Sequence, residues 1–318
     1  MAKGSTPSSG KIANPKPARS DRRQEPVPRH RPKSPDEDPD AASREGAILA
    51  SPSYVLAEQD LAFLARDETR GVRLQIEYLK PQIVLEEHGI HDTVVVYGST
   101  RIAEPAAARR RVEDLRHALK TDPRNAILTR ELAVAERILS KSRYYEVARE
   151  FASLVGRSKD GSRSRLVVMT GGGPGIMEAA NRGAFEVGAE TVGLNISVPH
   201  EQYPNPYITP ELCFRFHYFA LRKMHLVLRA KALVAFPGGF GTLDELFEVL
   251  TLVQTRKIKP IPIVLVGEEY WRRVIDFGFL ADEGVIGAED LKLFWFAETA
   301  NEIWSGILEW YERRGAPL

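Results

Sequence analysis

The chain alternates between short apolar runs and longer segments with helical spacing from about residue 91 onward. The apolar runs hold few polar positions, which is typical of strands buried on both faces of a sheet. We therefore expect strands at 93–99, 165–170, 191–196, 213–217, 232–236, 261–266 and 293–297. Helices are expected at 144–156, 175–187, 218–230, from 242 onward, 269–279 and 299–312. This order predicts a Rossmann-like α/β domain over 91–318, a doubly wound parallel sheet with helices on both faces.

Two further helical patterns flank the first expected strand. Residues 49–90 predict two helices that pack on the core of the domain. Their apolar side chains recur at helical spacing, namely Leu56, Leu61, Leu64, Val72, Ile76 and Leu79. Residues 105–142 predict an inserted helical pair, joined by the sequence KTDPRN. In that connection we expect Asp122 to cap the second helix and Pro123 to be its first residue.

The first 48 residues differ from the rest of the chain because they are rich in proline and mixed charges and poor in aliphatic side chains. Such a segment buries too little apolar surface to offset its ordering entropy, so we expect a disordered tail at 1–48. Its arginines suggest a transit peptide or a nucleic-acid-binding tail, but the interleaved acids and prolines argue against both.

Charge and cysteine content narrow the classes of partner. The chain has 44 basic and 43 acidic side chains, a formal net charge of +1, which gives no reason to expect binding to nucleic acid or to a membrane surface. Cys213 is the single cysteine, so no intrachain disulfide can form and a reducing compartment fits. No apolar run approaches the ~20 residues that span a bilayer. A cytoplasmic protein is therefore expected.

Three of the expected strands end in turns with few side chains. These turns are YGSTR at 97–101, TGGGPG at 170–175 and FPGGFGT at 236–242. Glycines let the backbone take positive φ and let an anion approach free N–H groups. Because ligands of open parallel sheets bind beyond the carboxyl ends of the strands, the three turns together indicate a ligand that carries a phosphate.

The common nucleotide motifs do not match. A P-loop needs a Lys-Ser/Thr pair after its glycines, and neither GGGPGIM nor GGFGTLD has one. The dinucleotide fingerprint fits at Gly171 and Gly173 but has Ile176 at its third glycine. The next strand ends in Asn195, where no acid is placed to hold an adenosine ribose. A smaller nucleotide or a sugar phosphate remains.

The acids after the third turn allow two interpretations. In one, Thr242 caps the helix and Glu245 completes a capping box, which needs no ligand. In the other, the amides of residues 239–242 and the Thr242 hydroxyl hold a phosphate, and Glu245 faces the attached sugar. A carboxylate there could stabilise the oxocarbenium-like state of N-glycosidic cleavage and orient water. Arg222 and Lys223 could supply the balancing cation, or they could form an ordinary solvated helix face.

Three segments resemble the Lonely Guy (LOG) family, in particular its longer bacterial members. GGGPGIMEAANRGA at 171–184, RK at 222–223 and PGGFGTLDE at 237–245 are similar to motifs that read approximately GGGxxGLM, RKxxM and PGGxGTxxE in that family. The resemblance covers roughly residues 90–310. It implies hydrolysis of a nucleoside 5′-monophosphate, such as AMP or a cytokinin riboside monophosphate, to free base and ribose 5-phosphate. It also implies a homodimer or larger homo-oligomer.

The resemblance also implies roles for individual residues. The catalytic pair falls on Arg222 and Glu245. The residues expected to bind the substrate are Ser99, Gly172, Gly173, Glu178, Lys223, Gly238, Gly239, Gly241 and Thr242. The chain departs from the pattern at Leu226, where RKxxM has methionine, and at Tyr97, where the family often has cysteine. Both departures are expected beside the catalytic pair and bear on base preference.

Other chemistries find little support in the sequence. His200, His217 and His225 are too scattered for a metal site, and no Gly-x-Ser-x-Gly or Cys–His pattern indicates a nucleophilic hydrolase. The family is often labelled lysine decarboxylase, but nothing marks a lysine for a pyridoxal phosphate Schiff base, and no cofactor is expected. Tyr203 and Tyr207 could stack on a base or simply form a loop. A nucleotide sensor with the same fold and no catalysis remains the alternative to the hydrolase.

Overall fold

The computed structural model describes residues 33–158, 166–198, 203–315 and 318. Residues Met1–Arg66 and Asp67–Leu318 form two separate compact units. The first unit holds α1 (Ala41–Leu49), the 3-10 helix η2 (Pro52–Tyr54) and the short α2 (Leu61–Leu64). Its helix α1 differs from the disordered tail predicted to residue 48, because AASREGAIL is rich in residues that favour helix. Residues 1–32 of that predicted tail lie outside the described residues.

The second unit is built on a seven-stranded sheet in which every neighbouring pair of strands is parallel. The strands are β1 (Asp92–Tyr97), β2 (Leu166–Thr170), β3 (Thr191–Ile196), β4 (Cys213–Phe216), β5 (Ala230–Ala235), β6 (Ile263–Val266) and β7 (Trp295–Ala297). Their order is β4-β3-β2-β1-β5-β6-β7, so the chain winds outward from β1 in one direction and then in the other. This is the doubly wound α/β fold that the sequence predicted.

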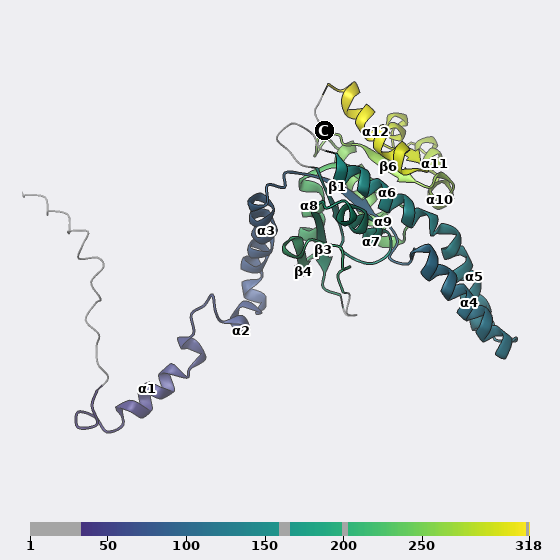
Figure 1. Ribbon diagram of the computed structural model, residues 1–318. Coiled ribbons are helices and arrows are strands. Elements are labelled where there is room, and N and C mark those ends of the chain that lie inside the picture. Colours follow the sequence, from purple (N-terminus) through teal and green to yellow (C-terminus); the bar gives the residue numbers. More distant parts are fainter. Residues whose placement is uncertain (1–32, 159–165, 199–202, 316–317) are drawn as a thin grey trace, which may run out of the picture. The chain divides into compact units, whose positions relative to one another are not determined.

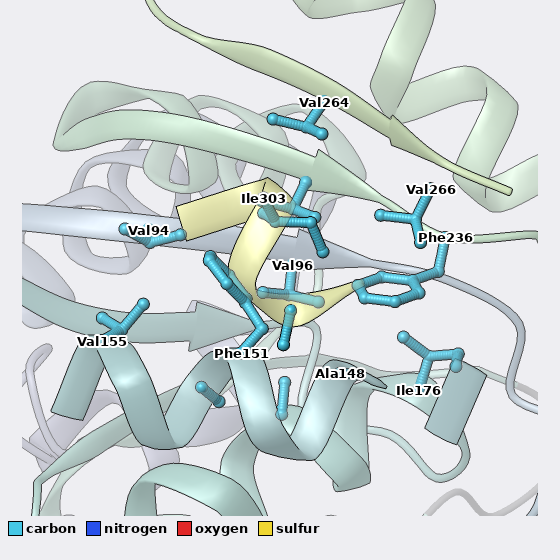
Figure 2. Close-up of a cluster of buried hydrophobic side chains, with 14 of the residues drawn as sticks. Val94, Val96, Ala148, Phe151, Val155, Ile176, Phe236, Val264, Val266 and Ile303 are labelled. Carbon is cyan, nitrogen blue, oxygen red and sulfur yellow. The ribbon is translucent and has the colours of Figure 1, made fainter. Parts of the chain in front are cut away.

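Helices cover both faces of the sheet (Figure 1). They are α3 (Arg70–Glu87), α6 (Arg143–Arg157), α7 (Ile176–Glu186), α8 (Phe219–Leu228), α9 (Phe240–Gln254), α10 (Glu268–Val274), α11 (Phe277–Asp282) and α12 (Ala300–Arg313), with the 3-10 helices η3 (Asp67–Thr69), η4 (Pro210–Leu212) and η5 (Ala288–Lys292). Side chains of β1 alternate between two cores because successive strand residues point to opposite faces. Val94 and Val96 join the core under α6, α7 and α12, which Figure 2 shows around Phe151 and Ile303. Val95 joins the core under α8 and α9.

The predicted insert is a helical pair, α4 (Pro105–Thr121) and α5 (Ala126–Lys141), with a small core of its own around Val112. Its connection differs from the prediction. Asn125, not Asp122, caps α5, because its side-chain oxygen accepts hydrogen bonds from the N–H groups of Ile127 and Leu128 at 3.0 and 3.1 Å. Pro123 lies before the helix and biases Asp122 toward the extended conformation that ends α4.

The apolar face predicted for α3 does not lie in the core. Val72, Ile76 and Leu79 are exposed, whereas Leu85 near the end of the helix is fully buried. The helix packs on α8, where the rings of Tyr78 and His225 lie 5.3 Å apart. No helix among the described residues is long and apolar enough to cross a membrane.

Candidate active site

A cavity of about 440 Å³ lies beyond the carboxyl ends of β1, β2 and β5, where the three glycine turns meet as the sequence predicted. These strands are neighbours at the centre of the sheet, at the point where the winding direction reverses. The cavity is lined by Tyr97, Gly98, Ser99, Thr100, Arg101, Gly171, Met177, Ile196, Phe219, Arg222, Gly239, Gly241, Thr242, Asp244 and Glu245.

The turn after β1 ties the other two turns together. The Ser99 N–H donates to the carbonyl of Pro237 at 3.0 Å, and the Ser99 carbonyl accepts from the Ile176 N–H at 3.2 Å. Gly175 has a φ of +73°, and a Cβ there would lie 2.4 Å from the Ser99 carbonyl oxygen. The glycine is needed at this position because both the backbone conformation and the close approach exclude a side chain.

The third turn leads into the N-terminus of α9, and the capping-box interpretation of it is wrong. Gly239 is the N-cap and the helix begins at Phe240, so Thr242 lies inside the first turn. Gly238 leaves room for the Thr242 hydroxyl, which would lie 2.1 Å from a Cβ at residue 238. The Leu243 N–H donates a hydrogen bond to the Gly239 carbonyl. The backbone N–H groups before Leu243 in the first turn of α9 therefore have no acceptor within the helix and are suited to bind an anion.

Arg222 and Glu245 form the most buried ion pair facing this cavity. Arg222 Nη1 lies 3.4 Å from Glu245 Oε1, and the two side chains are 13% and 7% exposed. The Arg222 Nε–H donates to the carbonyl of Leu194 at 2.7 Å, which fixes the guanidinium beside β3. A Cβ at Gly171 would lie 2.3 Å from Arg222 Nη2, so the bare backbone of the second turn makes room for the arginine.

Glu245 has an unusual protonation equilibrium. Burial raises its pKa to about 7, although the positive charges of Arg222 and Lys223 pull that pKa down. Its second oxygen, Oε2, is buried and has no hydrogen-bond partner among the described residues. A carboxyl group that titrates near neutral pH and has one oxygen without a hydrogen-bond partner is suited to contact a ligand and to accept or release a proton.

Several predicted site residues lie elsewhere. Lys223 Nζ pairs with Asp244 at 2.7 Å and with Glu248 at 3.4 Å, so it joins α8 to α9 and does not line the cavity. Glu178 accepts a hydrogen bond from the Tyr145 hydroxyl at 2.8 Å because the first turn of α7 directs it toward α6. The Gly238 carbonyl accepts a hydrogen bond from the Tyr270 hydroxyl, and this bond fixes the turn that precedes α9.

Gly172 and Gly173 also turn away from the cavity, toward Asn205. The Asn205 N–H donates to the Gly172 carbonyl at 2.9 Å, and its side-chain amide donates to the Gly173 carbonyl at 3.0 Å. The same amide donates to Asn181 at 2.9 Å, and Asn181 accepts from the Thr170 hydroxyl at 2.7 Å. This buried network anchors the turn after β2. This network was not predicted from the sequence, although an asparagine inside an apolar helix was the available signal.

The two residues that depart from the family motifs, Leu226 and Tyr97, lie in different environments. Leu226 is fully buried in the core and does not line the cavity, whereas Tyr97 lines it. Tyr207 packs on the ring of Phe185 and Tyr203 is 71% exposed, and neither lines the cavity, which favours the plain-loop interpretation. The apolar wall of the cavity was not predicted from the sequence, because only the fold brings Met177, Ile196 and Phe219 together.

The amino-acid sequence of this chain is similar to those of several named proteins. The Arabidopsis thaliana protein named cytokinin riboside 5′-monophosphate phosphoribohydrolase LOG1 is 31% identical over 147 residues, which cover 45% of this chain and 67% of that protein. The chain belongs to the LOG family. A second relative of this LOG-family chain is a probable cytokinin riboside 5′-monophosphate phosphoribohydrolase, LOGL3, from Oryza sativa subsp. japonica. It is 27% identical over 181 residues, 54% of this chain and 79% of the relative.

A family model described as "Possible lysine decarboxylase" matches residues 177–307 of the LOG-family chain. The matched range takes in α8 with Arg222 and α9 with Glu245. It begins after the glycines that follow β2, so the turn at 171–175 lies just outside it. The LOG relatives are named for a nucleotide substrate, whereas the description of the family model names lysine. Lys223 directly follows the cavity-lining Arg222 in the sequence. Its ammonium group is paired with the carboxylates of Asp244 and Glu248.

Proposed function

We propose that this LOG-family chain hydrolyses the N-glycosidic bond of a nucleoside 5′-monophosphate, AMP or a cytokinin riboside monophosphate, to free base and ribose 5-phosphate. The observation that supports this most is the buried Arg222–Glu245 pair beside the open N-terminus of α9 in a single cavity. The named activity of the LOG relatives is of the same kind.

The phosphate of the substrate binds at the start of α9. The amides of the first turn and the positive end of the helix dipole favour an anion there, and the Thr242 hydroxyl adds a donor. Arg222 contributes positive charge to the same cavity. Lys223, already paired with two carboxylates, acts only at a distance.

The reaction takes place one helical turn deeper, at Glu245. As the bond between C1′ and the base breaks, positive charge develops on the ribose ring, and the Glu245 carboxylate stabilises it. One water molecule adds its oxygen to C1′, one of its protons leaves with the base, and the other stays on the new hydroxyl, so the atoms balance. The base lies against the apolar wall of Met177, Ile196 and Phe219.

The pH dependence of turnover follows from the state of Glu245. Because its pKa is raised to about 7, the kcat should fall about tenfold for each pH unit below 7 and level off above it. The measurement is the initial rate of base release between pH 5 and pH 9 at saturating nucleotide. A flat profile across pH 6 to 8 would contradict a role for the Glu245 carboxylate.

The direct test is incubation of the full chain with AMP, GMP, CMP and a cytokinin riboside monophosphate, with the free base followed by chromatography. We expect base and ribose 5-phosphate in equal amounts from at least one of them. If no base appears while the nucleotide still binds by calorimetry, the chain is a sensor and the hydrolase proposal is wrong. The homodimer or larger assembly stays a prediction that light scattering on the same sample can test.

A further inference from the structure

Few polar side-chain atoms are buried without a hydrogen-bond partner in the part of the chain that the structure describes. They are Thr93 Oγ1, the Tyr97 hydroxyl, both ring nitrogens of His225, Glu245 Oε2 and Glu248 Oε2, the last of which still forms the ion pair with Lys223 at 3.4 Å. Of these residues, only Tyr97 and Glu245 line the central cavity. A buried polar group without a partner is unfavourable, so such groups are rare unless a ligand satisfies them. Two in one cavity indicate that the ligand is the missing partner.

Tyr97 is held rigidly at the end of β1. Its carbonyl accepts a hydrogen bond from the Phe236 N–H at 2.8 Å, and its side chain is packed in the core under α8 and α9 with 4% of the residue exposed. Burial raises the pKa of its hydroxyl well above the usual value, and the nearby carboxylate of Glu245 raises it further. The phenol is therefore neutral at physiological pH and can donate a hydrogen bond.

The position of Tyr97 and Glu245 in the cavity indicates which part of the substrate they contact. Thr242 and Glu245 are three residues apart on α9, which is about 4.5 Å along the helix axis. A phosphate at the first turn puts the next group of a nucleoside 5′-monophosphate, the ribose, at the level of Glu245. A second anion there would be repelled by the carboxylate. A neutral donor beside a carboxylate acceptor matches a hydroxyl group, which accepts one hydrogen bond and donates another.

We propose that the Tyr97 hydroxyl donates to a ribose hydroxyl at C2′ or C3′ that in turn donates to Glu245 Oε2, so that Tyr97 makes the site selective for nucleotides that carry this hydroxyl. This inference rests on the proposed function, because it assumes that a nucleoside monophosphate occupies the cavity. It assigns to Tyr97 a specificity role that a cysteine or phenylalanine at the same position could not fill with the same geometry.

The test compares Tyr97→Phe with the wild-type chain on AMP, 2′-deoxy-AMP and 3′-deoxy-AMP. For AMP, kcat/KM should fall about tenfold to hundredfold, since the ribose hydroxyl loses the donor that orients it toward Glu245. For the analogue that lacks the contacted hydroxyl, the variant and the wild type should agree within about threefold. Each ratio is taken between variants on one substrate, so the different intrinsic reactivity of deoxynucleosides cancels.

Tyr311→Phe is the matched control. Tyr311 is buried like Tyr97, but its hydroxyl donates a hydrogen bond to the carbonyl of Lys231 at 2.7 Å. Lys231 lies at the opposite end of β5 from the cavity. This variant should keep the activity of the wild type on all three nucleotides. It should also melt at a lower temperature because it leaves a carbonyl unpaired, whereas Tyr97→Phe should melt at the same temperature or higher.

The possible outcomes separate the two proposals. An equal loss on all three nucleotides, or no loss on AMP, overturns the role of Tyr97 and leaves the hydrolase standing. If the wild-type chain releases no base, the hydrolase fails, and the same comparison is made on nucleotide affinity by calorimetry. A loss of affinity in Tyr97→Phe for AMP but not for one deoxy analogue then supports the inference, and equal affinities overturn it. If AMP does not bind at all, both proposals fail.

Discussion

Replacing Glu245 by glutamine should reduce kcat for base release by about 10²–10⁴-fold while nucleotide affinity changes by no more than a few-fold. The size follows from losing the charge that stabilises the transition state and the group that orients water. Affinity should persist because the amides of α9, the Thr242 hydroxyl and Arg222 remain. The measurement is the rate of base release at saturating nucleotide, together with calorimetric titration of the same nucleotide.

The same variant carries an internal check on the fold. The pKa of Glu245 is raised on folding, so the wild-type chain is most stable below the unfolded pKa of the carboxyl and loses stability as the pH rises to about 7. Glu245→Gln lacks this loss and should melt at a higher temperature than the wild type at pH 8, with a smaller difference at pH 5. Glu309→Gln, which alters only an exposed pair with Arg313 on α12, should match the wild type in both measurements. An active Glu245→Gln would remove this residue from catalysis.

The second large effect is expected at Arg222. Arg222→Ala should lower kcat/KM by about 10²–10³-fold, because it removes a buried positive charge that faces the proposed phosphate and ribose. The arginine also pulls the pKa of Glu245 down, so the acidic limb of the rate profile should move to higher pH in the variant. A loss of activity with an unmoved acidic limb would mean that the two residues are not coupled.

Gly171→Ala tests the position of the arginine without changing any charge. The added Cβ would lie 2.3 Å from Arg222 Nη2, and because that atom is the end of a flexible side chain, the arginine should shift and the fold should survive. We expect a reduced kcat/KM with an unchanged melting temperature. Gly71→Ala, at a position in α3 with no atom within 4 Å of the new Cβ, should keep the kcat/KM of the wild type.

The fold could be predicted from the sequence because the apolar strands and the helical spacing are local signals. The strands fall within a few residues of their expected places, and the expected helix at 269–279 is broken only because Asp276 caps a new helix, accepting from the Phe279 N–H at 2.9 Å. The exposed face of α3 could not be predicted in the same way. Helical spacing shows that a helix has an apolar face, but not which neighbour covers it.

The site could be predicted only in part, for a physical reason. The glycine turns follow strand ends, where position in the fold follows from topology. Arg222 and Glu245 lie on helices, and they were predicted from their places in the motifs that resemble the LOG family. Glu178 and Lys223 are on helices, where a rotation of about 100° per residue decides between the cavity and a neighbouring helix. Tyr97 appeared in the sequence only as an unusual residue, and its meaning came from burial and from the lack of a partner atom.

The strand order has a consequence for the chain during synthesis. β1 lies between β2 and β5 in the sheet, but β5 starts at Ala230, more than a hundred residues after β1 ends. A nascent polypeptide that has emerged only as far as β4 therefore presents the apolar edge of β1 with unpaired backbone groups, which is a site for aberrant association. Such an intermediate also lacks α9, where the proposed nucleotide binds. That ligand could therefore stabilise the chain only after translation has passed residue 245.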